Sequence, residues 1–299
     1  MAMGKAHAGK ILDKVDGIKV LDCKKCGFSH ILPLPSDEEL QKFYTKDFYQ
    51  KEKTVYYFKE TKEDAAWWNA TYDNYYSILE RLIRGRKLLD IGSGTGDFLS
   101  VGKKRGWNIL GIEPSSVAAA HARRRGLAIV NDFFNPGSLR GRGPFDVITA
   151  FMVLEHVPDP ISFLREAKKL LKPSGLLLIF SPNDYNPFQQ IVRRKLPTEP
   201  WWVVPKHHIN YFGFFSIQKV LTRLGFRTEE MLGTFPMEFF LLSGDNYIGN
   251  SSLGRKCHSR RKKFEMNLYS ENPALLNSLY RTLGEQDIGR EFVAIARRK

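Results

Sequence analysis

The sequence is poor in cysteine, in long apolar segments and in acidic residues. Only three cysteines occur among 299 residues, which excludes the disulfide framework of a small secreted domain. No run of about 18 apolar residues is present, so the sequence predicts no transmembrane helix. The first residues also lack the apolar segment of a signal peptide. We therefore expect a cytoplasmic protein.

Acidic residues are outnumbered: 32 Asp and Glu stand against 46 Lys and Arg, for a formal net charge of +14. The excess is concentrated in residues 123–125, 193–195 and 255–263. Such clusters attract anions in general, nucleic acid included. No RNA-binding module accompanies them, so we expect a small-molecule acceptor rather than nucleic acid. A phosphate group on that acceptor would explain the charge, because Arg and Lys bind phosphate well.

The stretch of residues 87–99 organises the rest of the chain. Residues 87–91 form the short apolar run of a buried parallel strand. Three glycines follow at alternate positions, Gly92, Gly94 and Gly96. Glycine permits positive φ and lets a ligand approach the backbone closely. This arrangement predicts a strand that enters a helix through a ligand-binding turn.

An acidic residue supports this interpretation. Glu113 follows Gly92 by about twenty residues, where a second parallel strand should end and where an acid can bind ribose hydroxyls. Two interpretations compete for the pattern. Dinucleotide folds usually show G-x-G-x-x-G, whereas here Asp90 lies inside the strand and the glycines alternate.

The alternating pattern resembles motif I of the class I S-adenosylmethionine-dependent methyltransferases. Residues 145–160 resemble the fourth-strand signature of that family, and residues 171–182 resemble the segment that leads into its fifth strand. The resemblance spans roughly residues 72–232. The most similar subgroup is the one of ubiquinone-biosynthesis and sugar methyltransferases. The resemblance implies a methyltransferase with S-adenosyl-L-methionine as cofactor.

The alternation of strand and helix patterns predicts an α/β fold with a Rossmann-like, doubly wound sheet. We expect strands at residues 87–91, 108–112, 128–130, 145–150, 175–180, 227–232 and 289–297. The resemblance implies that the seventh strand is antiparallel and lies between the fifth and sixth. The expected parts are an N-terminal piece (1–50), the methyltransferase core (51–232), a helical insertion that caps the substrate cleft (233–283) and the last strand (284–299).

The N-terminal piece contains one C-x-x-C pair, Cys23 and Cys26, inside a predicted β-turn-β unit. A structural zinc ion needs about four ligands. His30 could be a third, and no fourth is evident in the sequence. We therefore expect a degenerate, metal-free knuckle and no metal site. Ser36 and Glu39 then form the S-x-x-E capping box of a helix.

Ligands of this fold bind beyond the carboxyl ends of the strands. Within the resemblance, that places the cofactor against Asp90, Gly92, Ser93, Gly94, Gly96, Glu113, Pro114, Asp132, Phe133, Phe151 and Met152. Glu113 is expected to bind the ribose, Asp132 the exocyclic amine of adenine, and Phe133 to stack beside the ring. The alternative role for Asp132 is to form a loop turn.

An oxygen or carbon acceptor needs a base, and a histidine near neutral pKa is suited to that role. The candidates are His208, His156 and His258, and the sequence leaves the choice among them open. In related methyltransferases a histidine aligns with His208, whereas the motif around His156 recurs with many acceptors, so His156 has a structural alternative.

The basic insertion supplies the candidate acceptor-binding residues. Arg255, His258 and Arg261 share a helical face, and Glu265 is placed to hold Arg261. We expect methyl transfer to an oxygen of a sugar, glycolipid or quinone-like compound. The alternatives are an RNA or protein methyltransferase that grips its substrate with the insertion, and a binding protein without catalysis.

Overall fold

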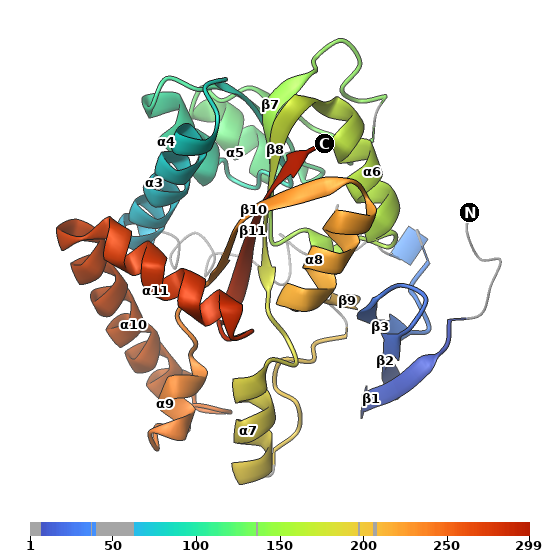
Figure 1. Cartoon of the computed structure of the whole chain (residues 1–299), viewed down its shortest axis with the longest axis vertical. Helices are drawn as coiled ribbons and strands as arrows, with labels where there is room; N and C mark the ends of the chain where they lie inside the picture. The colour runs from blue at the N-terminus through green and yellow to red at the C-terminus, as the bar shows by residue number, and fades with distance from the viewer. Residues whose placement is uncertain (1–6, 37, 40–62, 136, 197, 206–207) are drawn as a thin grey trace.

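The computed structural model describes residues 7–36, 38–39, 63–135, 137–196, 198–205 and 208–299. Seven strands form one sheet in the order β10-β11-β8-β7-β4-β5-β6 (Figure 1). Their bounds are β4 Lys87–Ile91, β5 Asn108–Ile112, β6 Ile129–Val130, β7 Phe145–Phe151, β8 Leu171–Pro182, β10 Phe226–Gly233 and β11 Glu291–Arg298.

The predicted topology is confirmed. Strand β11 pairs antiparallel with β8 on one side and with β10 on the other, so the last strand lies between the fifth and the sixth. The pairs of β4 with β5 and of β4 with β7 are parallel. The carboxyl ends of these strands therefore meet at one edge of the sheet, where the predicted cofactor residues lie.

Helices cover both faces of this sheet. Helices α3 (Ala65–Leu82), α4 (Asp97–Lys104) and α5 (Ser116–Arg124) lie over one face, and α6 (Pro160–Leu170) and α8 (Phe214–Arg223) over the other (Figure 1). Their starts follow ordinary capping rules. The Ser115 side chain accepts from a backbone N–H of α5, and the Asp159 side chain accepts from one of α6.

The aromatic stripe of α3 is a packing surface. Tyr75, Tyr76 and Leu79 are fully buried against the sheet, and the Tyr76 ring stacks on Phe98 with centroids 4.4 Å apart. Burial of side chains this large is the main attachment of α3 to the sheet. The aromatic residues between positions 44 and 58 lie outside the described residues.

The insertion contains three helices, α9 (Glu238–Leu242), α10 (Ser251–Glu271) and α11 (Pro273–Glu285). Helix α11 was not expected. Its residues Leu276 and Tyr280 join the same apolar core as α3 and the sheet, so α11 extends the helical layer. This part of the insertion is thus built into the core.

A second, antiparallel sheet has the order β1-β2-β3-β9. Its strands are β1 Gly9–Val15, β2 Ile18–Cys23, β3 Phe28–Leu32 and β9 Asn210–Tyr211. The β-turn-β unit around the cysteines is confirmed, whereas β1 and β9 were not expected. The Ser36–Glu39 capping box is also present, since the Glu39 backbone N–H donates to Ser36 Oγ at 3.2 Å.

A further helix, α7 (Pro187–Lys195), follows β8. Asn186 caps it, accepting from the Gln189 backbone N–H at 2.9 Å, and Pro187 occupies the first turn. Among the described helices, none combines the length and the apolar character that a membrane crossing requires.

Candidate active site

The turn after β4 has the backbone that the glycine spacing predicts. Gly92, Gly94 and Gly96 have φ values of +71°, +52° and +81°. A Cβ on Gly92 would lie 2.6 Å from Val153 Cγ2, and one on Gly96 would lie 2.3 Å from Leu127 Cδ1. Both the dihedral angles and the close packing therefore require glycine.

Glu113 lies beside this turn, at the carboxyl end of β5. Its Oε2 accepts from the Gly94 backbone N–H at 2.8 Å, and its Oε1 accepts from the Ser115 backbone N–H at 2.9 Å. Burial raises the pKa of the carboxyl group. Each oxygen keeps lone-pair capacity beyond its one backbone partner, so the carboxylate can accept further hydrogen bonds.

Two polar side chains accompany the turn. Asp90 is buried within β4 and accepts from Thr149 Oγ1 at 2.7 Å. Burial raises its pKa to about 7, and the charge of Glu113 adds to the rise. Ser93 Oγ is buried with no hydrogen-bond partner among the described residues. A buried hydroxyl without a partner is costly, and a polar ligand in the turn would satisfy it.

The Asp132 carboxylate makes hydrogen bonds within its own loop. Its Oδ1 accepts from the Phe133 backbone N–H at 2.8 Å, and its Oδ2 accepts from the Ser138 hydroxyl. Phe133 itself is half-buried beside it, and Pro114 is half-buried after Glu113. In this arrangement the Asp132 carboxylate already shapes the loop at the edge of the sheet.

Phe151 and Met152 end β7 in different environments. The Phe151 ring packs 4.5 Å from the Phe98 centroid and 5.6 Å from that of Phe180, inside an aromatic cluster. Met152 is 43% exposed and has a φ of +53°. An exposed apolar residue with strained backbone is typical of a functional site, so Met152 marks the open side of this edge.

Two of the three candidate histidines come together. The rings of His156 and His208 lie 5.1 Å apart, at an angle of 73°. His156 ends the short helix η2 (Leu154–His156) after β7, and His208 precedes β9. Backbone contacts hold the two segments in place, since the Ile209 N–H donates to the Glu155 carbonyl at 2.9 Å. The pair lies at the carboxyl edge of the sheet.

Glu155 completes this group, although the sequence did not mark it as a site residue. Its Oε1 lies 3.8 Å from His156 Nε2, and its Oε2 accepts from Ser181 Oγ at 2.8 Å. Burial raises its pKa to about 8. The carboxylate of Glu155 and the imidazoles of His156 and His208 therefore form one cluster, with ligand atoms within 4.8 Å of one another.

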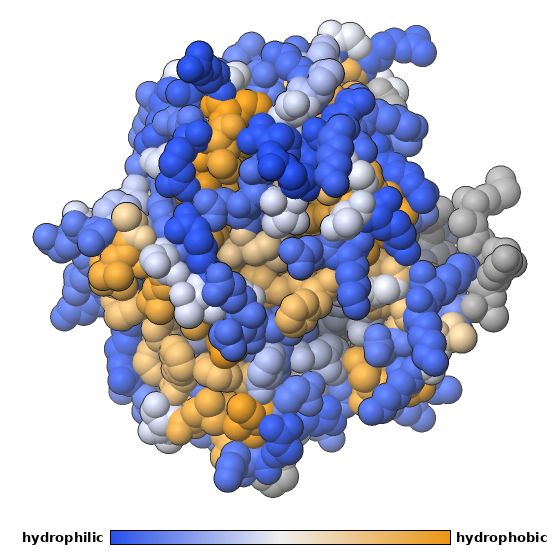
Figure 2. Space-filling view, in the orientation of Figure 1, coloured by the Kyte–Doolittle hydropathy of each residue, from blue (hydrophilic) through white to orange (hydrophobic). Residues whose placement is uncertain are grey.

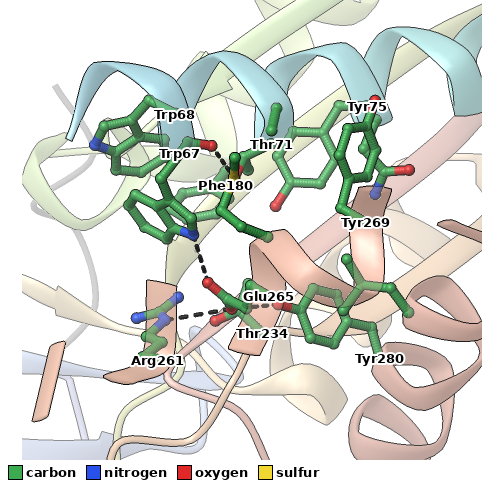
Figure 3. Close-up of a pocket in the computed structure, with 14 residues that line it drawn as sticks. Trp67, Trp68, Thr71, Tyr75, Phe180, Thr234, Arg261, Glu265, Tyr269 and Tyr280 are labelled. Carbon is green, nitrogen blue, oxygen red and sulfur yellow. Dashed lines mark hydrogen bonds and ion pairs between the residues drawn. The ribbon is translucent and has the colours of Figure 1, made fainter. Parts of the chain in front are cut away.

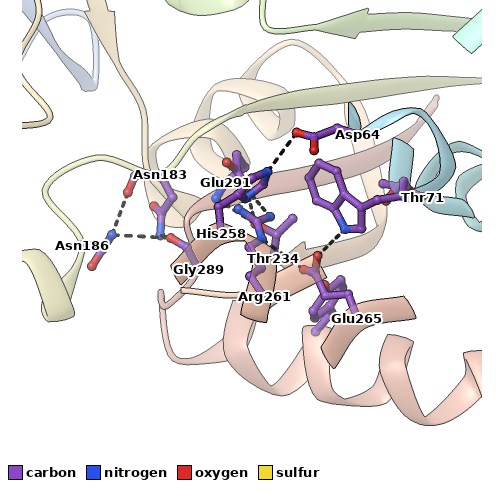
Figure 4. Close-up of polar contacts among 12 residues, drawn as sticks. Asp64, Thr71, Asn183, Asn186, Thr234, His258, Arg261, Glu265, Gly289 and Glu291 are labelled. Carbon is purple, nitrogen blue, oxygen red and sulfur yellow. Dashed lines mark hydrogen bonds and ion pairs between the residues drawn. The ribbon is translucent and has the colours of Figure 1, made fainter. Parts of the chain in front are cut away.

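His258 belongs to a different environment. Its Nε2 lies 3.0 Å from Asp64 Oδ2, and its ring meets that of Trp67 edge-on at 5.3 Å (Figure 4). Lys262 pairs with the same Asp64. The described contacts of His258 do not include His156 or His208, so the structure separates it from the histidine pair.

Arg261 is buried rather than open to a ligand. Its guanidinium pairs with Glu265 Oε1 at 3.3 Å and with Glu291 Oε2 at 3.1 Å (Figure 4). It also lies 5.2 Å from the Trp67 ring (Figure 3). Glu265 holds Arg261 as expected. The expectation that Arg261 is open to an acceptor is corrected, because two carboxylates of the protein already neutralise its charge. Arg255, the other expected acceptor-binding residue, is exposed on the same helix.

A small cavity adjoins this ion pair (Figure 3). Side chains of α3, α10 and α11 line it, together with Phe180 of β8. Its volume is about 30 Å³. That is room for ordered water but not for an acceptor molecule, so the cavity is a packing feature behind the sheet edge.

The N-terminal cysteines have more partners than the sequence indicated. His7, Cys23, Cys26 and His30 place four ligand atoms within 4.8 Å of one another. The fourth potential ligand, which was not evident in the sequence, is therefore His7. Strand pairing brings His7 to the cysteines, since Gly9 is the register partner of Cys23.

Comparison with known proteins defines the class. A family model described as a methyltransferase domain matches residues 66–231, more than half of the chain. The chain belongs to this methyltransferase family. The resemblance drawn from the sequence motifs is thereby confirmed.

Two curated relatives of the same name match part of this chain. The ubiquinone biosynthesis O-methyltransferase of Actinobacillus pleuropneumoniae serotype 7 (strain AP76) is 40% identical over 109 residues, or 33% of this chain and 47% of that protein. The enzyme of the same name from Caulobacter vibrioides is 32% identical over 171 residues, or 54% and 66%. The matches thus span between about half and two thirds of these relatives.

Solved structures support the fold. The plantazolicin methyltransferase BpumL, in complex with SAH, has a TM-score of 0.52 and 14% identity, covering 87% of this chain and 94% of its own. A SAM-dependent methyltransferase from Archaeoglobus fulgidus has a TM-score of 0.50 and 18% identity, covering 82% and 100%. These similarities confirm the Rossmann-like methyltransferase fold.

The glycine turn gives a first prediction. Gly96→Ala should destabilise the protein by about 2–5 kcal/mol, because it combines left-handed backbone strain with a clash against Leu127. Gly106→Ala is the matched control, since Gly106 has a φ of +79° and a Cβ there would meet none of the described residues within 4 Å. It should cost about 1–2 kcal/mol. Equal losses in urea unfolding would contradict the packing argument.

The buried ion pair gives a second prediction. Arg261→Ala removes the cation that pairs with the buried Glu265 and with the half-buried Glu291, and should cost about 3–5 kcal/mol. The control on the same helix is Arg260→Ala, whose exposed pair with Asp245 is worth less than about 1 kcal/mol. Thermal unfolding measures both. If the Arg261→Ala protein remained stable but bound its acceptor less tightly, Arg261 would belong to the acceptor site and the burial argument would be contradicted.

Proposed function

We propose that the chain is an S-adenosylmethionine-dependent methyltransferase that acts on a hydroxyl oxygen of a small acceptor. One observation carries the proposal: the glycine turn, Glu113 and the His156–His208 pair stand at the same carboxyl edge of one parallel sheet. A cofactor site and a base are what methyl transfer to oxygen requires of a protein.

The residues around the turn fit the cofactor. Gly92, Gly94 and Gly96 have positive φ values and carry no side chain, so that a ligand can approach the backbone at these positions. Glu113 offers carboxylate lone pairs to ribose hydroxyls, and Ser93 Oγ offers a buried hydroxyl. When bound, S-adenosylmethionine supplies a methyl group already activated by a sulfonium.

The histidine pair supplies the base. His208 accepts the proton of the acceptor hydroxyl, and His156 lies beside it at 5.1 Å between ring centroids. Glu155 is buried beside the pair, with its Oε1 3.8 Å from His156 Nε2. Met152 follows β7 at the same edge and is 43% exposed.

The surface favours an apolar, quinone-like acceptor over a sugar. Figure 2 shows apolar surface gathered on the lower part of this face, in the region where α9 lies in Figure 1. The exposed apolar residues of the insertion include Phe239, Leu242 and Phe264. The names of the curated relatives agree with this acceptor class.

The described charges give less support to an RNA substrate. Arg260, Arg261 and Lys262 are paired with carboxylates of the protein itself. A nucleic-acid groove presents its cations to solvent along a track. Tight RNA binding that weakens steeply as the salt concentration rises would favour the alternative of an RNA methyltransferase.

A third prediction tests the cofactor. Calorimetry should show binding of S-adenosylhomocysteine without competition by NAD. Glu113→Ala should weaken the binding by about 1.5–3 kcal/mol, since a charge-assisted contact to the ribose is lost. Glu285→Ala, at an exposed position of α11, is the control and should leave the affinity unchanged. Binding of NAD instead would refute the assignment.

A fourth prediction tests the base. His208→Gln should lower kcat by about 10²–10⁴-fold, because general base catalysis contributes that much. The affinity for S-adenosylhomocysteine should not change. The control is His121→Gln, because His121 lies on α5 and neither His156 nor His208 belongs to that helix. Assays use hydroxylated aromatic acceptors with and without a polyisoprenoid tail, and a sugar series. Full turnover by His208→Gln would exclude it as the base.

A further inference from the structure

A cluster of side chains outside the methyltransferase site has the composition of a metal centre. It consists of His7, Cys23, Cys26 and His30, with Cys23 and His30 buried and the other two half-buried. Two thiols and two imidazoles form the donor set that tetrahedral zinc prefers. Nothing in the proposed methyl transfer uses these residues.

The distances within the cluster fit a tetrahedron. His7 Nδ1 lies 3.5 Å from Cys23 Sγ and 3.4 Å from Cys26 Sγ. With zinc–sulfur bonds of about 2.3 Å and zinc–nitrogen bonds of about 2.05 Å, the sulfur–nitrogen edge of a tetrahedron is about 3.6 Å. The nitrogen–nitrogen edge would be about 3.3 Å, and His7 Nδ1 lies 2.9 Å from His30 Nε2. A shift of a few tenths of an ångström accommodates the ion.

The surrounding contacts orient the ligands. His30 Nδ1 lies 2.9 Å from the Ile31 carbonyl oxygen, which can only accept, so Nδ1 carries the proton. The Nε2 lone pair is then turned to the cluster. A backbone N–H, that of Cys26, donates to Cys23 Sγ at 3.5 Å and stabilises a thiolate there. Such outer contacts are typical of built metal sites.

The loop between the cysteines is shaped for this arrangement. Gly27 has a φ of +83°, and its N–H donates to the Cys23 carbonyl at 2.9 Å. The turn therefore folds back so that both sulfurs face one point. Lys24 N–H donates to the Ala8 carbonyl at 3.1 Å, which holds the segment of His7 beside the turn.

The geometry points to a structural zinc site formed by His7, Cys23, Cys26 and His30. This reverses the expectation of a metal-free knuckle, because that expectation depended on a missing fourth ligand. All four coordination positions are filled by protein, so the ion serves folding rather than catalysis. Two cysteines lose their protons on binding, and the thiolates form the two zinc–sulfur bonds.

The site would also steady the edge where the histidine pair lies. His30 on β3 is the register partner of Asn210 on β9, two residues after His208. The Asn210 side chain donates to the Leu154 and Val157 carbonyls at 3.1 and 2.7 Å, on either side of Glu155 and His156. Loss of zinc should therefore loosen β9 as well as β1.

The test uses the untagged full-length chain, purified from zinc-supplemented medium. Elemental analysis should find about one zinc per chain. Replacement by cobalt(II) should give the visible bands of tetrahedral thiolate–imidazole coordination. Cys23→Ser and His7→Ala should lose at least tenfold in zinc affinity, measured against a chromophoric chelator. Cys257→Ser is the control, because Cys257 is buried in α10 outside the cluster.

A second readout does not depend on the variants. Zinc removal by a chelator should lower the melting temperature and raise amide exchange in residues 9–32 and 209–212, and added zinc should restore both. Binding of S-adenosylhomocysteine to the turn after β4 should persist. A chain with less than about 0.1 zinc and no cobalt bands, folded normally, would overturn the proposal.

Discussion

The bond between Glu113 and the turn after β4 is the constraint on which the proposed site depends. The carboxylate accepts from Gly94 at the end of one strand and from Ser115 at the start of the next helix. The Glu113 carboxylate therefore connects the turn after β4 with the segment between β5 and α5. The strand pairing of the parallel sheet brings these two segments close together but does not fix their conformations. The energy comes from charge-assisted hydrogen bonds in a buried setting. Backbone hydrogen bonds from Gly92 and Ser93 to the Ile112 carbonyl hold the same turn against β5.

The two sheets meet where the proposed chemistry occurs. The larger sheet provides the edge with the glycine turn, and the smaller one contributes β9, which positions His208 opposite His156. The stacked rings of Phe28 and Phe212, 4.5 Å apart, strengthen this junction. The N-terminal strands are thus part of the site's support, even though no residue among them is assigned to catalysis.

The sequence predicted the features that depend on local pattern. Strand and helix alternation indicated the sheet, and the spacing of Gly92, Gly94 and Gly96 predicted the turn. The features that the sequence did not predict depend on contacts between residues that are far apart in the chain. His7 reaches Cys23 only through β1, and β9 is two residues long, too short for a periodic signal. Helical spacing put Arg261 and Glu265 together but could not show that the terminal strand adds Glu291 and buries both.

A crystal structure of the chain with S-adenosylhomocysteine tests the central claim most directly. The account predicts the ribose at the Glu113 carboxylate, the backbone of the turn after β4 against the ligand, and the ligand's sulfur directed toward His156 and His208. A ligand bound at another edge of the sheet, or with its sulfur turned away from both histidines, would contradict the account.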